Sequence, residues 1–245
     1  MKKYRMCKGC LLVAIIALLG LSACQKESDY YLDSGLANPY FSGTTVDYLN
    51  AKPFYFDTIA AIVNLAGMED VFTSDTITFF APTDLSVQLL IENTNTILYA
   101  LGYDTIRTLQ DVPQNIWRKY LSRYVFHGAN QLKDYPQVDY DALQDYPGQS
   151  YLSWDGTPMN IGVVFNDASD GTNVVKYAGY RQLSITYIPD VSAPTSDWFP
   201  YYVASSNILT DNGVVHVLNA LHDTFGFDLE EFVEDVESAF ATGTK

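Results

Sequence analysis

Side chains suited to proton transfer or nucleophilic attack are few in this chain. Its three histidines are His127, His216 and His222, and His222 is followed by Asp223. A hydrolase needs a nucleophile placed beside such a histidine. The sequence has no G-x-S-x-G elbow, no glycine-rich phosphate loop and no H-E-x-x-H helix. We therefore predict a protein that is not an enzyme and has no cofactor, and a hydrolase is the least favoured alternative.

Two segments suggest metal binding on first inspection. The segment Asn166–Gly171 offers oxygen ligands and a glycine, but it lacks the alternating spacing and the closing glutamate of a calcium loop. Cys7 and Cys10 form a C-x-x-C pair, but this pair lies inside an N-terminal targeting segment. We predict no metal site.

Residues 1–23 have the pattern of a cleaved signal peptide. Four basic residues stand among the first eight, and the apolar run Leu11–Leu19 is too short to remain as a membrane-spanning helix. The following Leu21–Cys24, LSAC, resembles the lipobox of bacterial lipoproteins. We expect cleavage before Cys24 and acylation of its side chain, with an ordinary secretory signal as the alternative.

Cleavage would leave a strongly acidic chain. The remaining 222 residues keep 10 of the 14 basic residues and all 29 acidic ones, a formal charge of −19. Such a surface repels nucleic acid and anionic headgroups, so any membrane attachment must come from the lipid. We expect an outer-membrane lipoprotein, on either its periplasmic or its surface face. Residues 24–53 are predicted to be a polar tether, whose acidic start, Gln25–Asp29, is either a surface-export signal or a generic linker.

The stretch Thr78–Val87, TFFAPTDLSV, predicts a strand, a tight turn and a helix within ten residues. Its β-branched and aromatic start suits a buried strand. Pro82 would end that strand, because proline has no N–H for a central ladder. Thr83 or Asp84 can accept hydrogen bonds from the next turn and so start a helix.

Two segments together resemble the signatures of the fasciclin (FAS1) domain family. The first includes Thr78, Phe79, Phe80, Ala81, Pro82, Thr83 and Asp84, and the second includes Asn212, Gly213 and His216 within NGVVHVL. The resemblance implies an α+β fold, a FAS1-type β-sandwich or wedge with several small helices and a C-terminal helix. It also implies a non-enzymatic adhesion or binding module. Many members have a Tyr-His pair between the two signatures, which in animal members is linked to integrin binding. Here Val125 follows Tyr124, so integrin binding is not carried over.

Local patterns predict the other elements of a FAS1 domain over residues 54–227. We expect a helix capped by Asp57, helices over 85–91 and 96–109, and another starting near Pro113. Strands are expected over 124–126, 149–154, 160–165, 173–177, 182–187, 201–210 and 214–218, with an Asn212-Gly213 turn at positive φ. Residues 228–245 should form a docked amphipathic helix, with Asp228 and Glu231 as a capping box.

Aromatic residues between the two signatures are candidate ligand contacts. The chosen residues are Trp154, Trp198, Tyr201 and Tyr202. Trp198 and Tyr201 follow a polar loop, so we expect both to be at least partly exposed and to lie near Tyr146 or Trp154. The alternative is that these aromatic residues belong to the core.

The tripeptide Asp-Thr-Ile occurs three times, at Thr58, Thr76 and Thr105. It resembles the acceptor of a protein O-glycosylation system in some bacteria. The alternative is that Asp-Thr caps helices and opens strands.

Taken together, the sequence predicts an envelope binding module for a surface protein or glycan, and the second candidate is an accessory lipoprotein of an outer-membrane glycan-uptake complex.

Lipidation can be tested with Cys24→Ala. The variant should leave the membrane fraction or retain its signal peptide, because stable anchoring needs acyl chains. Fractionation and intact mass would show this. A processed Cys24→Ala protein that still requires detergent for extraction would contradict the prediction.

Overall fold

The computed structural model describes residues 38–193, 195, 198–219 and 224–242. From Pro39 onward the chain forms one folded unit. The predicted signal peptide, Cys24, the first part of the tether and the pair His222 and Asp223 lie outside the described residues. None of the helices in the described ranges combines the length and hydropathy needed to cross a bilayer.

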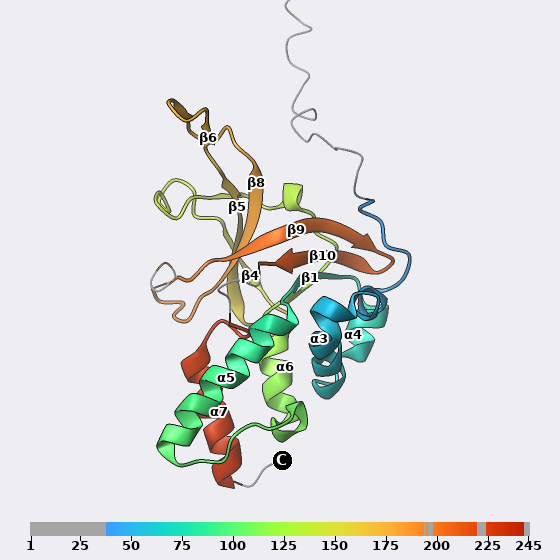
Figure 1. The fold of residues 1–245 in the computed structure, drawn as a ribbon. Helices are drawn as coiled ribbons and strands as arrows, with labels where there is room; N and C mark the ends of the chain where they lie inside the picture. The colour runs from blue at the N-terminus through green and yellow to red at the C-terminus, as the bar shows by residue number, and fades with distance from the viewer. Residues whose placement is uncertain (1–37, 194, 196–197, 220–223, 243–245) are drawn as a thin grey trace, which may run out of the picture. The chain divides into compact units, whose positions relative to one another are not determined.

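One curled sheet organises the folded unit. Its strand order is β2 (Val125–His127), β1 (Ile77–Ala81), β10 (Gly213–Leu218), β9 (Tyr201–Thr210), β8 (Arg181–Tyr187), β5 (Pro158–Phe165) and β3 (Gln137–Val138), and β4 (Gln149–Leu152) pairs with β5. In Figure 1, β5 and β8 run steeply across the direction of β9 and β10. The Trp154 N–H, just beyond β4, donates to the Val125 carbonyl at 2.8 Å, which brings the two ends of the sheet together. A separate short hairpin, β6 (Ala168–Ser169) and β7 (Val174–Val175), projects from the end of β5 and β8.

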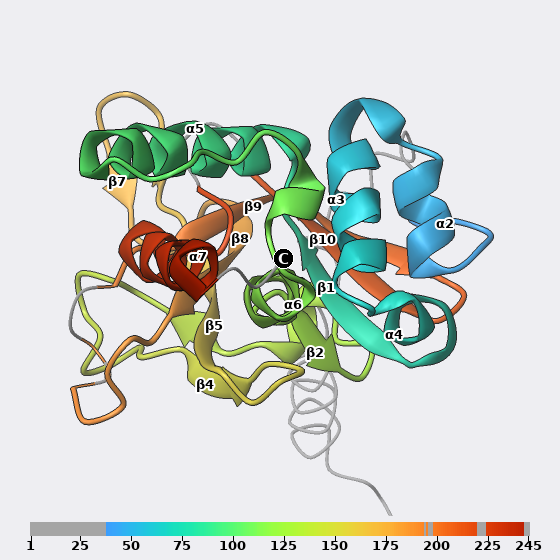
Figure 2. The same cartoon turned by 90° about the horizontal axis from the view of Figure 1, so that it is seen from below.

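Helices cover one face of this sheet. They are α2 (Thr45–Asn50), α3 (Pro53–Leu65), α4 (Glu69–Ser74), α5 (Asp84–Leu101), α6 (Gln114–Ser122) and α7 (Leu229–Thr242), and η2 (Leu109–Asp111) and η3 (Leu132–Asp134) are single 3₁₀ turns. Figure 2 shows helices α2 to α7 in front of the strands. The expected α+β fold, with packed helices and a C-terminal helix, is therefore confirmed.

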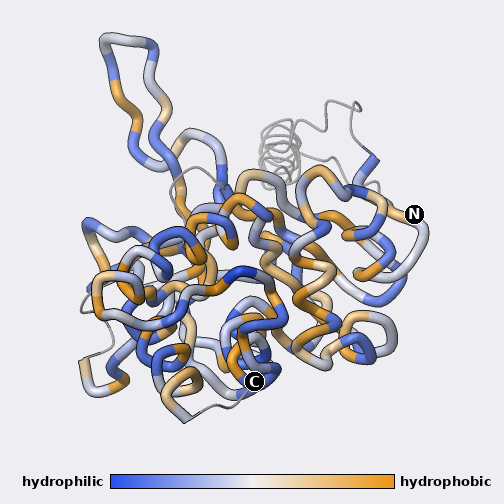
Figure 3. Tube along the Cα trace, turned by 60° about the horizontal axis from the view of Figure 1, so that its bottom comes forward, coloured by the Kyte–Doolittle hydropathy of each residue, from blue (hydrophilic) through white to orange (hydrophobic). Residues whose placement is uncertain are grey.

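The two sequence signatures are neighbouring strands. β1 pairs in parallel with β10 from Ile77 opposite Gly213 to Ala81 opposite Val217. All five residues of β1 are buried, and the Phe80 and His216 rings lie 5.1 Å apart. Hydrophobic stretches of the chain run through the interior of the domain in Figure 3. The resemblance between the two motifs and the FAS1 signatures thus corresponds to a physical contact at the centre of the fold.

The turn between β9 and β10 forms as expected, but for a different reason. Neither Asn212 nor Gly213 has a positive φ. A Cβ on Gly213 would lie 2.0 Å from the Ile77 carbonyl oxygen, so glycine permits close approach of two strands. The Asn212 amide donates to the carbonyls of Phe72 and Asp75 and accepts from the Thr45 N–H. Asn212 therefore connects the turn to the α2 and α4 regions through hydrogen bonds.

The folded unit begins earlier than the predicted boundary near residue 54. Residues 39–53, assigned to the tether, belong to it: Tyr40 pairs with Leu209, and α2 buries Leu49 completely. Thr44 and Asp47 form a capping box at the start of α2. The segment is short and mostly polar, so its composition did not reveal the capping box at the start of α2 or the buried Leu49.

Two helix predictions were wrong. Asp57 does not cap α3, because the helix starts at Pro53, where proline is tolerated in the first turn. A single helix, α5, replaces the two expected over 85–91 and 96–109. The polar residues in its middle do not interrupt it: the Asn95 side chain forms hydrogen bonds with both backbone groups of Ile106, at 2.7 and 2.8 Å, outside the helix.

A nearly fully buried arginine holds the C-terminal helix on the domain. The Arg123 side chain is 2% exposed, lies against the rings of Tyr120 and Tyr187, and pairs with Glu231 of α7. Asp228 accepts from the Glu231 N–H at 3.0 Å, as expected for a helix cap. The Glu231 carboxylate does not complete the predicted capping box, because it pairs with Arg123 and Lys119.

Phe80→Ala should destabilise the fold severely. Phe80 is fully buried and packs on Phe126, Tyr135 and His216. Truncation of a buried aromatic residue costs about 3–5 kcal/mol. Phe199→Ala is the matched control, because Phe199 is 77% exposed, and its effect should be within about 0.5 kcal/mol. Urea unfolding of both variants measures the difference, and a Phe80→Ala loss no larger than that of the control would contradict the packing described.

Candidate functional site

A cavity of about 940 Å³ opens between α3 and α5. Figure 2 shows these helices side by side, with the segment that follows α5 running back along it. The floor comes from the ends of β9 and β10, through Ala204, Val217 and Leu218, and the wall after α5 comes from residues 106–109. Cavities of about 300–1,000 Å³ are the usual size for ligand sites.

Exposed apolar side chains form the lip of the cavity. Phe54 is 86% exposed, Tyr55 is 54% exposed and Leu85 is 42% exposed. Three consecutive aromatic residues open α3, and a helix cannot direct all three toward one core. Phe56 takes the buried position, so Phe54 and Tyr55 remain outside at the cavity.

The inner wall is apolar and held in place. Val87 and Leu218 are buried at 0% and 3% exposure, and Ile106 is buried at 4%. The Asn95 bonds to Ile106 described above fix the loop after α5 against that helix. The lining is therefore supported by the sheet, by α5 and by a pinned loop.

Three charged residues line this cavity, and Asp84 is the one with a structured environment. Its Oδ1 accepts from the backbone N–H groups of Thr58 at 3.0 Å and Ile59 at 3.1 Å. The expected capping role is wrong: neither Thr83 nor Asp84 caps α5 through its side chain, and Asp84 joins α5 to α3 instead. The other two charged residues, Glu92 and Arg107, are exposed.

Asp84 shares a hydrogen bond with a second carboxyl group, Asp57 of α3. Burial, this bond and the negative charge of Asp57 raise the pKa of Asp84 to about 6, although the two N–H donors act in the opposite direction. The same bond lowers the pKa of Asp57. The pair thus holds a proton on Asp84 in mildly acidic solution, and both groups are charged well above pH 6.

His216 is a core residue, as its place in the motif predicted. It is fully buried, and its Nδ1 accepts from the Asn207 N–H at 3.2 Å, while Nε2 lies 3.0 Å from the Asn130 carbonyl oxygen. Burial lowers the pKa of His216 to about 4, so the ring is neutral at neutral pH. Its ring nitrogens are both occupied by backbone groups.

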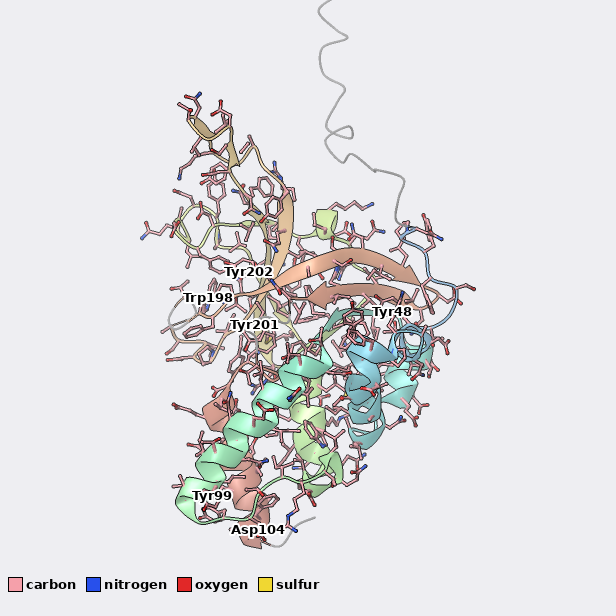
Figure 4. All side chains as sticks on the ribbon, in the orientation of Figure 1. Tyr48, Tyr99, Asp104, Trp198, Tyr201 and Tyr202 are labelled. Atoms are coloured by element: carbon pink, nitrogen blue, oxygen red, sulfur yellow. The ribbon has the colours of Figure 1, made fainter. Side chains whose placement is uncertain are left out.

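The candidate aromatic contacts do not form one surface. Tyr201 is only 8% exposed, stacks on Phe227 and donates to the Thr224 carbonyl at 2.9 Å, so its expected exposure is wrong. Trp198 is half-buried, as expected, and Trp198 and Tyr202 both pack against Tyr140. Figure 4 shows Trp198, Tyr201 and Tyr202 gathered where β9 begins.

Trp154 and Tyr146 lie in other ring clusters. Trp154 packs against His127, with ring centroids 4.1 Å apart. Tyr146 packs edge-on against Tyr177. Alternation along β9 separates Tyr201, which faces the core, from its neighbour Tyr202, which does not.

The three Asp-Thr-Ile threonines have different surroundings. Thr76 is exposed just before β1. Thr58 is half-buried inside α3 and lines the cavity, and Thr105 is half-buried in the loop after α5. Their glycosylation stays a prediction, and Thr76 is the most accessible of the three.

Known proteins offer little guidance. No family model matches this sequence, and no curated protein matches it. Among solved structures, a FAS1 domain pair from the insect cell adhesion molecule Fasciclin I is similar, with 15% identity and a TM-score of 0.47. The match covers 78% of this chain and 52% of the Fasciclin I chain. These values are too low to transfer a function or a site residue.

The free energy of unfolding of Asp84→Asn should rise relative to that of the native chain as pH increases. The folded-state pKa of Asp84, about 6, lies above its ordinary value of 3.8. The native chain therefore loses stability between about pH 4 and pH 6, because its folded state must give up a proton that the unfolded state has already lost. Asparagine keeps the acceptor oxygen for Thr58 and Ile59 and carries no charge.

Urea unfolding at pH 4, 5, 6 and 7 measures this difference. His216 contributes equally to both proteins, so its titration cancels. Asp57→Asn is the control. This variant keeps Asp84 but removes the neighbouring charge, so its stability should depend less on pH than that of the native chain. An Asp84→Asn protein less stable than the native chain at pH 7 would disprove the assignment.

Proposed function

We propose that this protein is a non-enzymatic binding module of a Gram-negative cell envelope, held by lipid on Cys24, and that its partner is a surface protein. The cavity between α3 and α5 is the observation that carries this proposal. Its volume of about 940 Å³ and its apolar lip suit the side chains of another protein.

The composition of the lip favours a protein partner over a glycan. Phe54, Tyr55 and Leu85 place two aromatic groups and one aliphatic group at the opening. Aromatic anchors beside a pocket are typical of the residues that dominate protein interfaces. The exposed lining of the cavity is mainly apolar, which also favours the side chains of a protein over a sugar.

Glycan binding, including a role in a glycan-uptake complex, is the second candidate. It is favoured by the exposed Phe199, at 77%, next to the half-buried Trp198. Exposed aromatic rings of this kind can stack on sugars. Phe199→Ala should then reduce retention on a glycan array without changing the cavity.

Leu85→Glu should close the cavity to apolar probes. The neutral dye N-phenyl-1-naphthylamine fluoresces in apolar sites, and we expect its binding to weaken at least about tenfold, because a carboxylate at the lip opposes desolvation. Leu101→Glu is the matched control on the same helix: Leu101 is 57% exposed and does not line the cavity. Absence of dye binding by the native chain, or equal binding by both variants, would contradict the proposal.

A further inference from the structure

One polar part of the cavity wall lies at the start of α5. Thr83 and Asp84 line it there, beside Leu85. Glu92 is exposed and already bonds to Gln88 at 2.8 Å, so solvent weakens its attraction for a partner. Asp84 is only partly exposed and is fixed by two backbone N–H groups, so its charge has a defined position.

The Asp57 and Asp84 carboxyl groups lack a counter-ion within the described ranges. No lysine or arginine there forms an ion pair with either group. The ion pairs in these ranges are between Arg118 and Asp155, and between Lys119 and Arg123 and the acidic residues of α7. Two carboxylates close enough to share a hydrogen bond repel each other when both are charged. A cation placed beside them would remove this repulsion.

A buried hydroxyl group next to Asp84 gives independent support. Thr83 is 8% exposed, and its Oγ1 has no hydrogen-bond partner among the described residues. An unpaired buried hydroxyl is costly, so native structures usually satisfy it. Thr83 lines the same cavity, directly beside Asp84.

We propose that the partner segment bound in this cavity carries a lysine or arginine, whose charged group rests on Asp84 while neighbouring apolar side chains fill the cavity. This inference rests on the proposed function and names the chemistry of its partner. The chain that remains after the expected cleavage, with a formal charge of −19, attracts a basic partner over longer distance. Arg107 is the one cation that lines the cavity among the described residues, and it comes from the wall after α5.

Selection from a random 12-residue peptide library tests the inference. The native chain should enrich peptides that combine apolar residues with at least one lysine or arginine. Asp84→Asn should enrich apolar peptides without this basic residue, because the neutral amide offers no charge. Asp70→Asn, an exposed residue of α4 outside the cavity, removes the same charge and should select as the native chain does.

A pH series gives a second readout. The best basic peptide should bind at least about tenfold more weakly to Asp84→Asn than to the native chain at pH 7.5. For the native chain its affinity should fall between pH 7.5 and pH 5, as Asp84 gains a proton. The other charged groups in this region are Asp57, which is hydrogen-bonded to Asp84, and Glu92 and Arg107, which line the cavity.

The outcomes separate the two proposals. Peptides that lose binding in Leu85→Glu but show no basic enrichment overturn the cation inference and leave the cavity as the binding site. Peptides indifferent to Leu85→Glu, or no enriched peptide, overturn the proposed function itself. Equal basic enrichment by the native chain and Asp84→Asn places the cation elsewhere and also overturns the inference.

Discussion

The parallel pairing of β1 with β10 is the constraint on which the rest of the domain depends. It brings together chain segments more than 130 residues apart, and it requires Gly213, because a Cβ there would lie 2.0 Å from the Ile77 carbonyl oxygen. Beyond this contact, Asn212 joins the turn to α2 and α4, and Phe80 meets the neutral His216 in the core. The cavity floor is the continuation of β10 at Val217 and Leu218, so the site inherits its position from this pairing.

The sequence predicted those elements whose signals are local and strong. The strand ending at Pro82, the β9–β10 hairpin and the amphipathic C-terminal helix all form near their expected bounds. The predictions failed where a distant partner decides. The helices expected over 85–91 and 96–109 form one helix, whose Asn95 bonds to Ile106 outside it. Asp84 was expected to cap this helix, but it accepts from two N–H donors of α3. Composition alone cannot identify such a partner.

The candidate site was missed for the same reason, although a signal was present. Three aromatic residues in succession at the start of α3 cannot all be buried, and Phe54 and Tyr55 are the two that remain exposed. The aromatic residues chosen from sequence were grouped by proximity along the chain. Strand alternation instead places Tyr201 in the core and Tyr202 against Tyr140, while Trp154 belongs to the β2 end of the sheet.

The charged form of Asp84 destabilises the folded state, and a purely structural role does not explain why an aspartate stands there. If its only task were to accept from Thr58 and Ile59, an asparagine would provide the same oxygen without a charge beside Asp57. A carboxylate there is destabilising above pH 6, in contrast to the Arg123–Glu231 pair, where the buried charge has an opposite charge beside it. Charged groups held at a cost to stability are typical of binding sites, because the partner supplies the missing counter-charge. The uncompensated carboxyl pair and the apolar cavity are therefore most simply understood as two parts of one recognition surface.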